Sequence, residues 1–99
     1  METTGQRFKK IRTYLNLAQD DFGSKIGLSK SAVSAVENDK SFISIEIQRT
    51  LFMDYNINLN WLVCGVGSMF NKKPVQYEQV EEEFEAKVEA VLKKKGIIL

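Results

Sequence analysis

The fold is decided by residues 17–38, which read LAQDDFGSKIGLSKSAVSAVEN. Within this stretch, residues 19–26 carry Phe22 and Ile26 four positions apart, which is the spacing of one helix face. Gly27 follows at once, and glycine readily adopts the positive φ that a sharp turn requires. The pattern therefore predicts a short helix over residues 19–26 that ends in a tight turn.

A second short helix is predicted directly after this turn, over residues 30–37. Ser29 precedes it and is a favoured N-cap, because its hydroxyl can accept a hydrogen bond from a free backbone N–H. Val33 and Val36 face inward at helical spacing, and small Gly23 lies where the two helices must approach closely. The outer face of the second helix is polar. Such a slender helix fits the DNA major groove, about 12 Å wide, where base edges are distinguishable.

Three more helices are predicted around this segment, which makes the domain all-α. The first covers residues 4–15, where Thr3 and Gln6 have the spacing of a capping box. The second follows the N-cap candidate Ser44, and the third covers residues 59–64. Within the third, we expect Trp61 to belong to the core and Cys64 to be partly buried and inert.

The domain is expected to span residues 1–70, followed by a linker over residues 71–76 and an amphipathic helix over residues 77–99. The apolar side chains of this last helix fall within an arc of about 120° at 100° per residue. They include Tyr77, Val80, Phe84, Val88 and Val91. Because the five-helix unit is expected to be complete without it, this apolar face needs a partner, and a second copy is the simplest one. Packing on its own domain is the alternative.

Composition argues against several classes of function. The 99 residues include no histidine, and the single Cys64 cannot form an intramolecular disulfide or a zinc site built from several thiolates. Without a Gly-rich phosphate loop or paired catalytic carboxylates, we expect no catalytic residues, no metal and no cofactor. No stretch approaches the roughly 20 apolar residues of a membrane span. No signal peptide is visible, so the expected compartment is cytoplasmic.

Charge is distributed unevenly along the chain, whose net charge is +1. Residues 1–40 hold seven cations and five acids, a net charge of +2. Residues 77–99 hold four lysines and six glutamates, a net charge of −2. A weakly basic front half permits nucleic-acid binding without requiring it.

The decisive segment resembles the lambda-repressor-like family of helix-turn-helix proteins, also called the Cro and xenobiotic-response-element type. The matching positions are Leu17, Gln19, Gly27, Ser29, Val33, Ser34, Glu37 and Asn38. The resemblance continues through LNWL at residues 59–62 and GVGSMF at residues 65–70, so it covers roughly residues 5–70. It implies a five-helix domain that binds double-stranded DNA and regulates transcription.

The resemblance also implies roles for individual residues. The base-reading positions are Lys30, Ser31, Ser34 and Ala35. The phosphate-contacting positions are Gln19 and Lys40, joined by Ser29, whose main role is expected to be the N-cap. Arg12 and Glu37 match a family ion pair that links the first helix to the end of the third. Since only Lys30 has a long side chain, direct base readout is expected to be thin, with DNA shape contributing.

The sequence departs from the family pattern at several positions. Ala18 stands where the family has a Ser or Thr cap, a loss of about 1 kcal/mol. Asp39 stands at a usual Gly, and Gly23 stands at a common Ala. Asp20 and Asp21 favour the start of their helix through its dipole, but they would also repel phosphate.

These observations predict a repressor that binds an inverted-repeat operator as a homodimer, with its two recognition helices about 34 Å apart. The alternative is a protein-interaction module, such as an antitoxin, that binds a protein partner through the C-terminal helix. The weak positive charge of residues 1–40 keeps this alternative open. DNA affinity that falls as salt rises would favour the first reading. A heterologous protein bound through residues 77–95 would favour the second.

Overall fold

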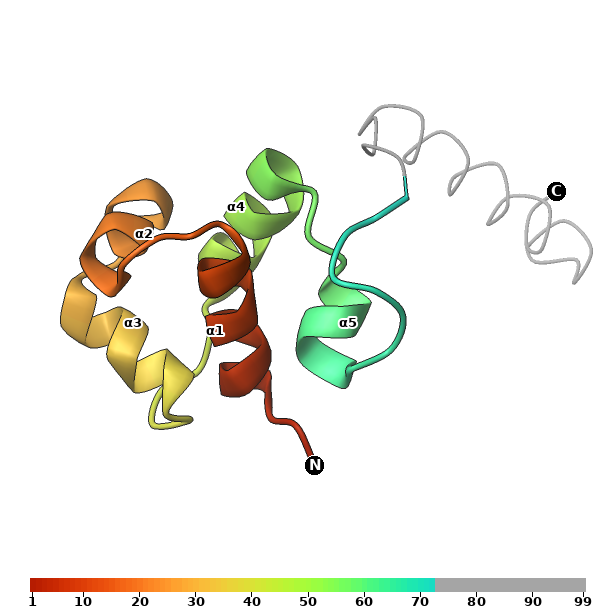
Figure 1. The fold of residues 1–99 in the computed structure, drawn as a ribbon, viewed down its shortest axis with the longest axis horizontal. Helices are drawn as coiled ribbons and strands as arrows, with labels where there is room; N and C mark the ends of the chain where they lie inside the picture. The colour runs from red at the N-terminus through yellow and green to blue at the C-terminus, as the bar shows by residue number, and fades with distance from the viewer. Residues whose placement is uncertain (73–99) are drawn as a thin grey trace, which may run out of the picture.

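The computed structural model describes residues 1–72, and five helices make up this part of the chain. They are α1 (Thr4–Tyr14), α2 (Gln19–Ile26), α3 (Lys30–Glu37), α4 (Ile45–Tyr55) and α5 (Leu59–Cys64) (Figure 1). These residues contain no strand, only an isolated antiparallel bridge between Ile57 and Phe70. The predicted all-α fold is confirmed. The expected helix over residues 77–99 lies outside the described residues, as does most of the expected linker.

Local sequence signals account for where the helices begin. Thr3 and Gln6 form both hydrogen bonds of a capping box at the start of α1. At the starts of α3, α4 and α5, backbone N–H groups donate hydrogen bonds to the side chains of Ser29, Ser44 and Asn58. Ala18 makes no such side-chain bond at the start of α2. The predicted N-caps Thr3, Ser29 and Ser44 are therefore confirmed.

The core forms where the apolar sides of the five helices meet. Its fully or nearly fully buried members are Phe8, Ile11, Phe22, Ile26, Val33, Val36, Ile47, Leu51, Ile57 and Leu62. The rings of Phe8 and Phe22 pack at a centroid distance of 5.3 Å, tilted by 55°. Figure 1 shows α2 and α3 on one side of α1 and α5 on the other, so α1 lies between the two parts of the domain.

The structure differs from the sequence-based expectation around α5. Trp61 is only half-buried and packs against the edge of the core, and Cys64 is exposed rather than partly buried. The reason is that α5 has six residues and one fully buried side chain, Leu62. The first helix also ends one residue early, at Tyr14, because Leu15 serves as its C-cap.

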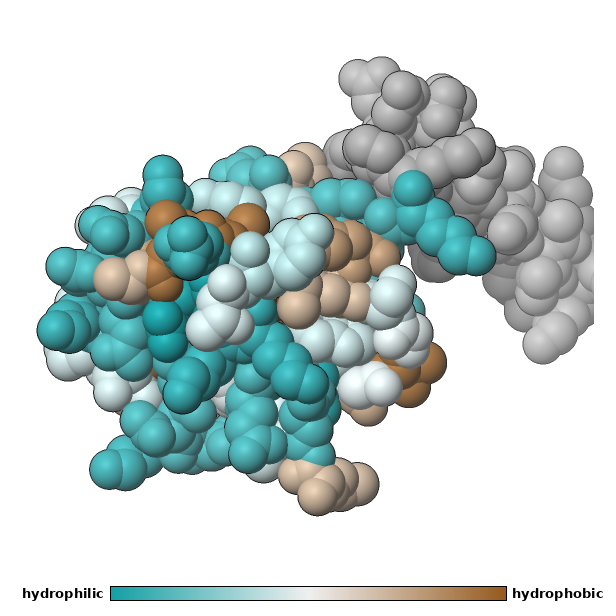
Figure 2. Space-filling model, viewed as in Figure 1, coloured by the Kyte–Doolittle hydropathy of each residue, from teal (hydrophilic) through white to brown (hydrophobic). Residues whose placement is uncertain are grey.

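The chain after α5 folds back onto the domain. The Asn58 N–H donates to the Met69 carbonyl at 2.8 Å, and the Asn71 N–H donates to the Asn56 carbonyl at 3.0 Å. The ring of Phe70 packs on Tyr14 at a centroid distance of 5.0 Å. Residues 65–71 therefore join the end of α4 to α1. The view in Figure 2 is mainly hydrophilic around α1, and its hydrophobic areas are separate from one another.

Candidate nucleic-acid interface

A single turn sets the angle between α2 and α3. Gly27 has a φ of 86°, in the left-handed region that glycine adopts without strain. The backbone N–H groups of Gly27 and Leu28 both donate to the Gly23 carbonyl at 2.8 Å. These two bonds close the end of α2 and direct the chain into α3.

Gly23 is required by the close approach of this turn. A Cβ atom at position 23 would lie 2.3 Å from the Leu28 carbonyl oxygen and 3.2 Å from a methyl group of Val33. The first distance is too short for any real contact, and the atom it meets belongs to the backbone. Glycine at this position therefore lets α2 lie directly against the residues that begin α3.

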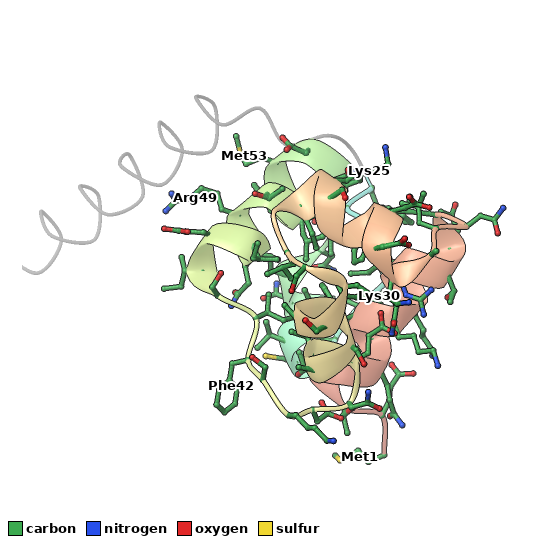
Figure 3. All side chains as sticks on the ribbon, turned by 90° about the vertical axis from the view of Figure 1, so that its left-hand side faces the viewer. Met1, Lys25, Lys30, Phe42, Arg49 and Met53 are labelled. Carbon is green, nitrogen blue, oxygen red and sulfur yellow. The ribbon has the colours of Figure 1, made fainter. Side chains whose placement is uncertain are left out.

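The outer face of α3 carries the predicted base-reading residues. Lys30 and Ser31 are exposed at its first turn, and Ser34 and Ala35 are half-buried one turn further on. Figure 3 looks onto this side of the molecule, with Lys30 near the middle of the view and Phe42 at its edge. The Ser34 hydroxyl also lies 3.4 Å from the Asn38 amide nitrogen. Lys30 and Ser31 are thus the more accessible half of this set.

The three predicted phosphate-contacting residues border the same helix. Ser29 uses its hydroxyl to cap α3, accepting the Ala32 N–H at 3.1 Å. Gln19, at the first position of α2, is half-buried and donates to Glu37 at 3.3 Å. Lys40 is exposed, two residues beyond the C-cap of α3. They lie at both ends of α3 and so flank the base-reading set.

The far end of α3 is fixed to α1 by an ion pair. Arg12 donates through Nε and Nη2 to the two carboxylate oxygens of Glu37 at 2.7 and 3.0 Å. A third bond joins Arg12 Nη1 to the Leu17 carbonyl at 2.9 Å. The hydrogen bond to Glu37 raises the pKa of the Arg12 guanidinium, which keeps it charged. Because the Glu37 side chain is 3% exposed, this bidentate pair is a rigid brace.

Intramolecular contacts engage most of the acidic residues near this face. Glu37 forms an ion pair with Arg12. Glu2 forms an ion pair with Lys10 and also approaches Arg7. The Asp39 carboxylate accepts two hydrogen bonds from the start of α1. Within residues 1–40 this leaves Asp20 and Asp21 as acids without an ion pair or a long-range hydrogen bond. The cations Lys30 and Lys40 are free of ion pairs among the described residues. Each of these ion pairs removes one cation together with one acid, so the net charge of residues 1–40 stays at +2, and Lys30 and Lys40 are among the cations that remain available to an anion.

Sequence reasoning missed the contacts of Asp39. It noted an acid at a usual glycine position but found no partner for it. The partners, Thr3 and Gly5, lie 36 and 34 positions earlier in the chain. Such a contact has no local sequence signal. Asp39 has a φ of 58°, which is consistent with the glycine that the family pattern has at this position.

Two further properties of residues 1–72 concern metal ions and membranes. This part holds no group of three or more His, Cys, Asp or Glu side chains that could bind a metal ion. Its helices are all too short or too polar to cross a membrane.

Two short helices joined by a glycine turn, with the second presenting a polar face, define the helix-turn-helix class. The chain belongs to the helix-turn-helix domain family, whose model matches residues 5–68. The described fold is similar to a crystal structure of the P22 c2 repressor protein in complex with synthetic operator 9T in the presence of Tl+. That match has a TM-score of 0.60 and 23% identity, and it covers 66% of this chain and 98% of the other. The lambda-repressor-like fold is confirmed. No curated protein sequence matches the chain.

Proposed function

We propose that this protein is a sequence-specific DNA-binding regulator of transcription that acts as a repressor. The observation that carries the proposal is the accessible polar face of α3, held by the Gly27 turn at one end and by Arg12 and Glu37 at the other. A fixed helix with an exposed polar face can lie in the major groove without reorganising. The similar P22 c2 repressor was crystallised with an operator. On this proposal the protein is not an enzyme and works in the cytoplasm.

The proposed contacts divide into two kinds. Lys30, Ser31, Ser34 and Ala35 would read base edges, with Lys30 donating to guanine and Ala35 touching a thymine methyl group. Gln19, Ser29 and Lys40 would bind phosphates and so set the position of α3 on the duplex. The Gln19 amide has two N–H donors, so the bond to Glu37 leaves one for a phosphate oxygen.

The proposed assembly is a homodimer formed by the apolar stripe of residues 77–91. Two copies would present two α3 helices about 34 Å apart, one helical turn of DNA, to an inverted-repeat operator. Occlusion of polymerase at that operator would then repress transcription.

Selection of bound duplexes from a random library at several salt concentrations tests the proposal. We expect an enriched inverted repeat, with affinity that falls linearly on a logarithmic salt scale as counterions are released. Enrichment of no sequence, together with no retained duplex at low salt, would overturn it. A heterologous protein that co-purifies through residues 77–95 would instead favour a protein-interaction module.

A further inference from the structure

We infer that Asp39 is a positioning residue for DNA binding: its carboxylate fastens the turn after α3 to the start of α1 and thereby directs Lys40 toward a phosphate. This inference rests on the proposed function. The Thr3 hydroxyl donates to Asp39 Oδ2 at 2.6 Å, and the Gly5 N–H donates to Asp39 Oδ1 at 2.9 Å. Both carboxylate oxygens of an otherwise exposed side chain are therefore engaged by one distant helix end.

The start of α1 is built to receive this carboxylate. The first backbone N–H groups of a helix lack intrahelical partners and carry partial positive charge, which favours an anion. Thr3 satisfies the Gln6 N–H, and Asp39 satisfies the Gly5 N–H. Two free donors of α1 are therefore bound by different acceptors. Gln6 is bound by the local cap, Thr3, and Gly5 is bound by Asp39 from the far end of α3.

Gly5 is a second sign that the two helix ends are closely fitted. A Cβ atom at position 5 would lie 2.3 Å from the Val36 carbonyl oxygen and 2.5 Å from Asp39 Oδ1. The space that a side chain would fill is occupied by the end of α3 and by the carboxylate itself. Asp39 and Gly5 therefore both contribute to the close contact between the end of α3 and the start of α1.

The torsion at Asp39 fixes where the chain goes next. Asp39 has a φ of 58°, and the following N–H, that of Lys40, donates to the Ala35 carbonyl at 2.8 Å. Among residues other than glycine, asparagine and aspartate adopt this conformation most readily, and the two side-chain bonds hold Asp39 in it. With the torsion and the side chain both fixed, Lys40 leaves the end of α3 in one direction.

The direction in which DNA affinity changes when the Asp39 charge is removed separates a positioning role from simple charge repulsion. Removing a negative charge beside DNA should strengthen binding if Asp39 merely repels phosphate. If Asp39 positions Lys40, its removal should weaken binding despite the gain in positive charge. The two roles therefore predict opposite changes for Asp39→Gly, which loses the carboxylate but accepts the positive φ.

The test measures the affinity and salt slope of a fluorescein-labelled duplex enriched by the library selection. Lys40→Ala should reduce the logarithmic salt slope by about one, the signature of one lost phosphate contact. Asp39→Gly should reduce the slope equally and weaken binding on the order of tenfold. The double variant should bind no more weakly than Lys40→Ala alone. Asp39→Asn retains the shape and the acceptor for Gly5 but loses the acceptor for Thr3, so it should bind no more tightly than the wild type although a negative charge is gone.

Asp54→Asn is the matched control, because it removes one acid from an exposed site on α4. It should leave the slope unchanged. A wild-type slope in Asp39→Gly, tighter DNA binding by Asp39→Asn than by the wild type, or an unchanged slope in Lys40→Ala would each overturn the inference while DNA binding itself stands. Absence of any duplex binding by the wild-type protein would overturn the proposed function as well. Circular dichroism verifies folding, and Asp39→Asn alone can still refute the inference should Asp39→Gly unfold.

Discussion

Arg12 and Glu37 join α1 to the last residue of α3 through two hydrogen bonds, at 2.7 and 3.0 Å, in a nearly buried site. We expect Glu37→Ala to lower the free energy of unfolding by about 3 kcal/mol, because it leaves a largely buried guanidinium without its carboxylate. Urea denaturation measures the change. Lys10→Ala, which breaks an exposed ion pair with Glu2, is the control and should change stability by less than about 1 kcal/mol. Equal losses of stability in the two variants would contradict the stabilising role of the Arg12–Glu37 pair.

Lys30→Ala should weaken operator binding by about 1–3 kcal/mol and relax the preference at one base pair. The reason is that Lys30 is the only long side chain among the proposed base-reading residues. The measurement is a repeat of the library selection with the variant. Lys72→Ala removes the same charge from the segment after α5, on the other side of the molecule from α3 (Figure 1), and should leave the preference intact. An unchanged footprint and affinity in Lys30→Ala would remove Lys30 from the reading face.

Gly23→Ala should destabilise the fold by about 2 kcal/mol, although alanine is the better helix former by roughly 1 kcal/mol. The added methyl group would lie against the Leu28 carbonyl oxygen, which belongs to the turn itself and has little room to move. Thermal denaturation followed by circular dichroism reports the change. The neighbouring Ser24→Ala, at an exposed position of the same helix, should be neutral or slightly stabilising. Stabilisation by Gly23→Ala would show that the turn can relax.

Phe84→Glu should yield monomers that bind the operator weakly, because it places a charge in the centre of the proposed apolar stripe. Sedimentation velocity measures the oligomeric state directly. Glu83→Gln, which changes charge off the stripe, should remain dimeric. Dimers that persist in Phe84→Glu would rule out the stripe as the interface.

The helix-turn-helix segment could be predicted closely because its signals are local. Gly27 supplies the turn, Ser29 supplies the cap, and Phe22 and Val33 supply the helical spacing. Each signal acts within four residues of the feature it controls. The observed bounds of α2 and α3 therefore match the predicted ranges.

Features that depend on contacts between distant segments could not be predicted. Arg7 is 7% exposed because its guanidinium donates to the Leu62 carbonyl at 2.8 Å, 55 positions away. Only the approach of α5 to α1 creates that acceptor. Exposure of Cys64 has the same origin, since it depends on how α5 lies against the domain. Asp39, whose partners lie at the start of α1, belongs to this group too.

The return of residues 65–71 onto the domain sets a boundary for shortening the protein. The Asn71 amide donates to the backbone carbonyls of Asn56 and Ile57 at 3.4 and 3.3 Å, and the Phe70 ring packs on Tyr14. A fragment cut after Cys64 keeps all five helices yet loses these ties. The smallest autonomous unit should accordingly be sought at Asn71, seven residues past the point where the helices stop.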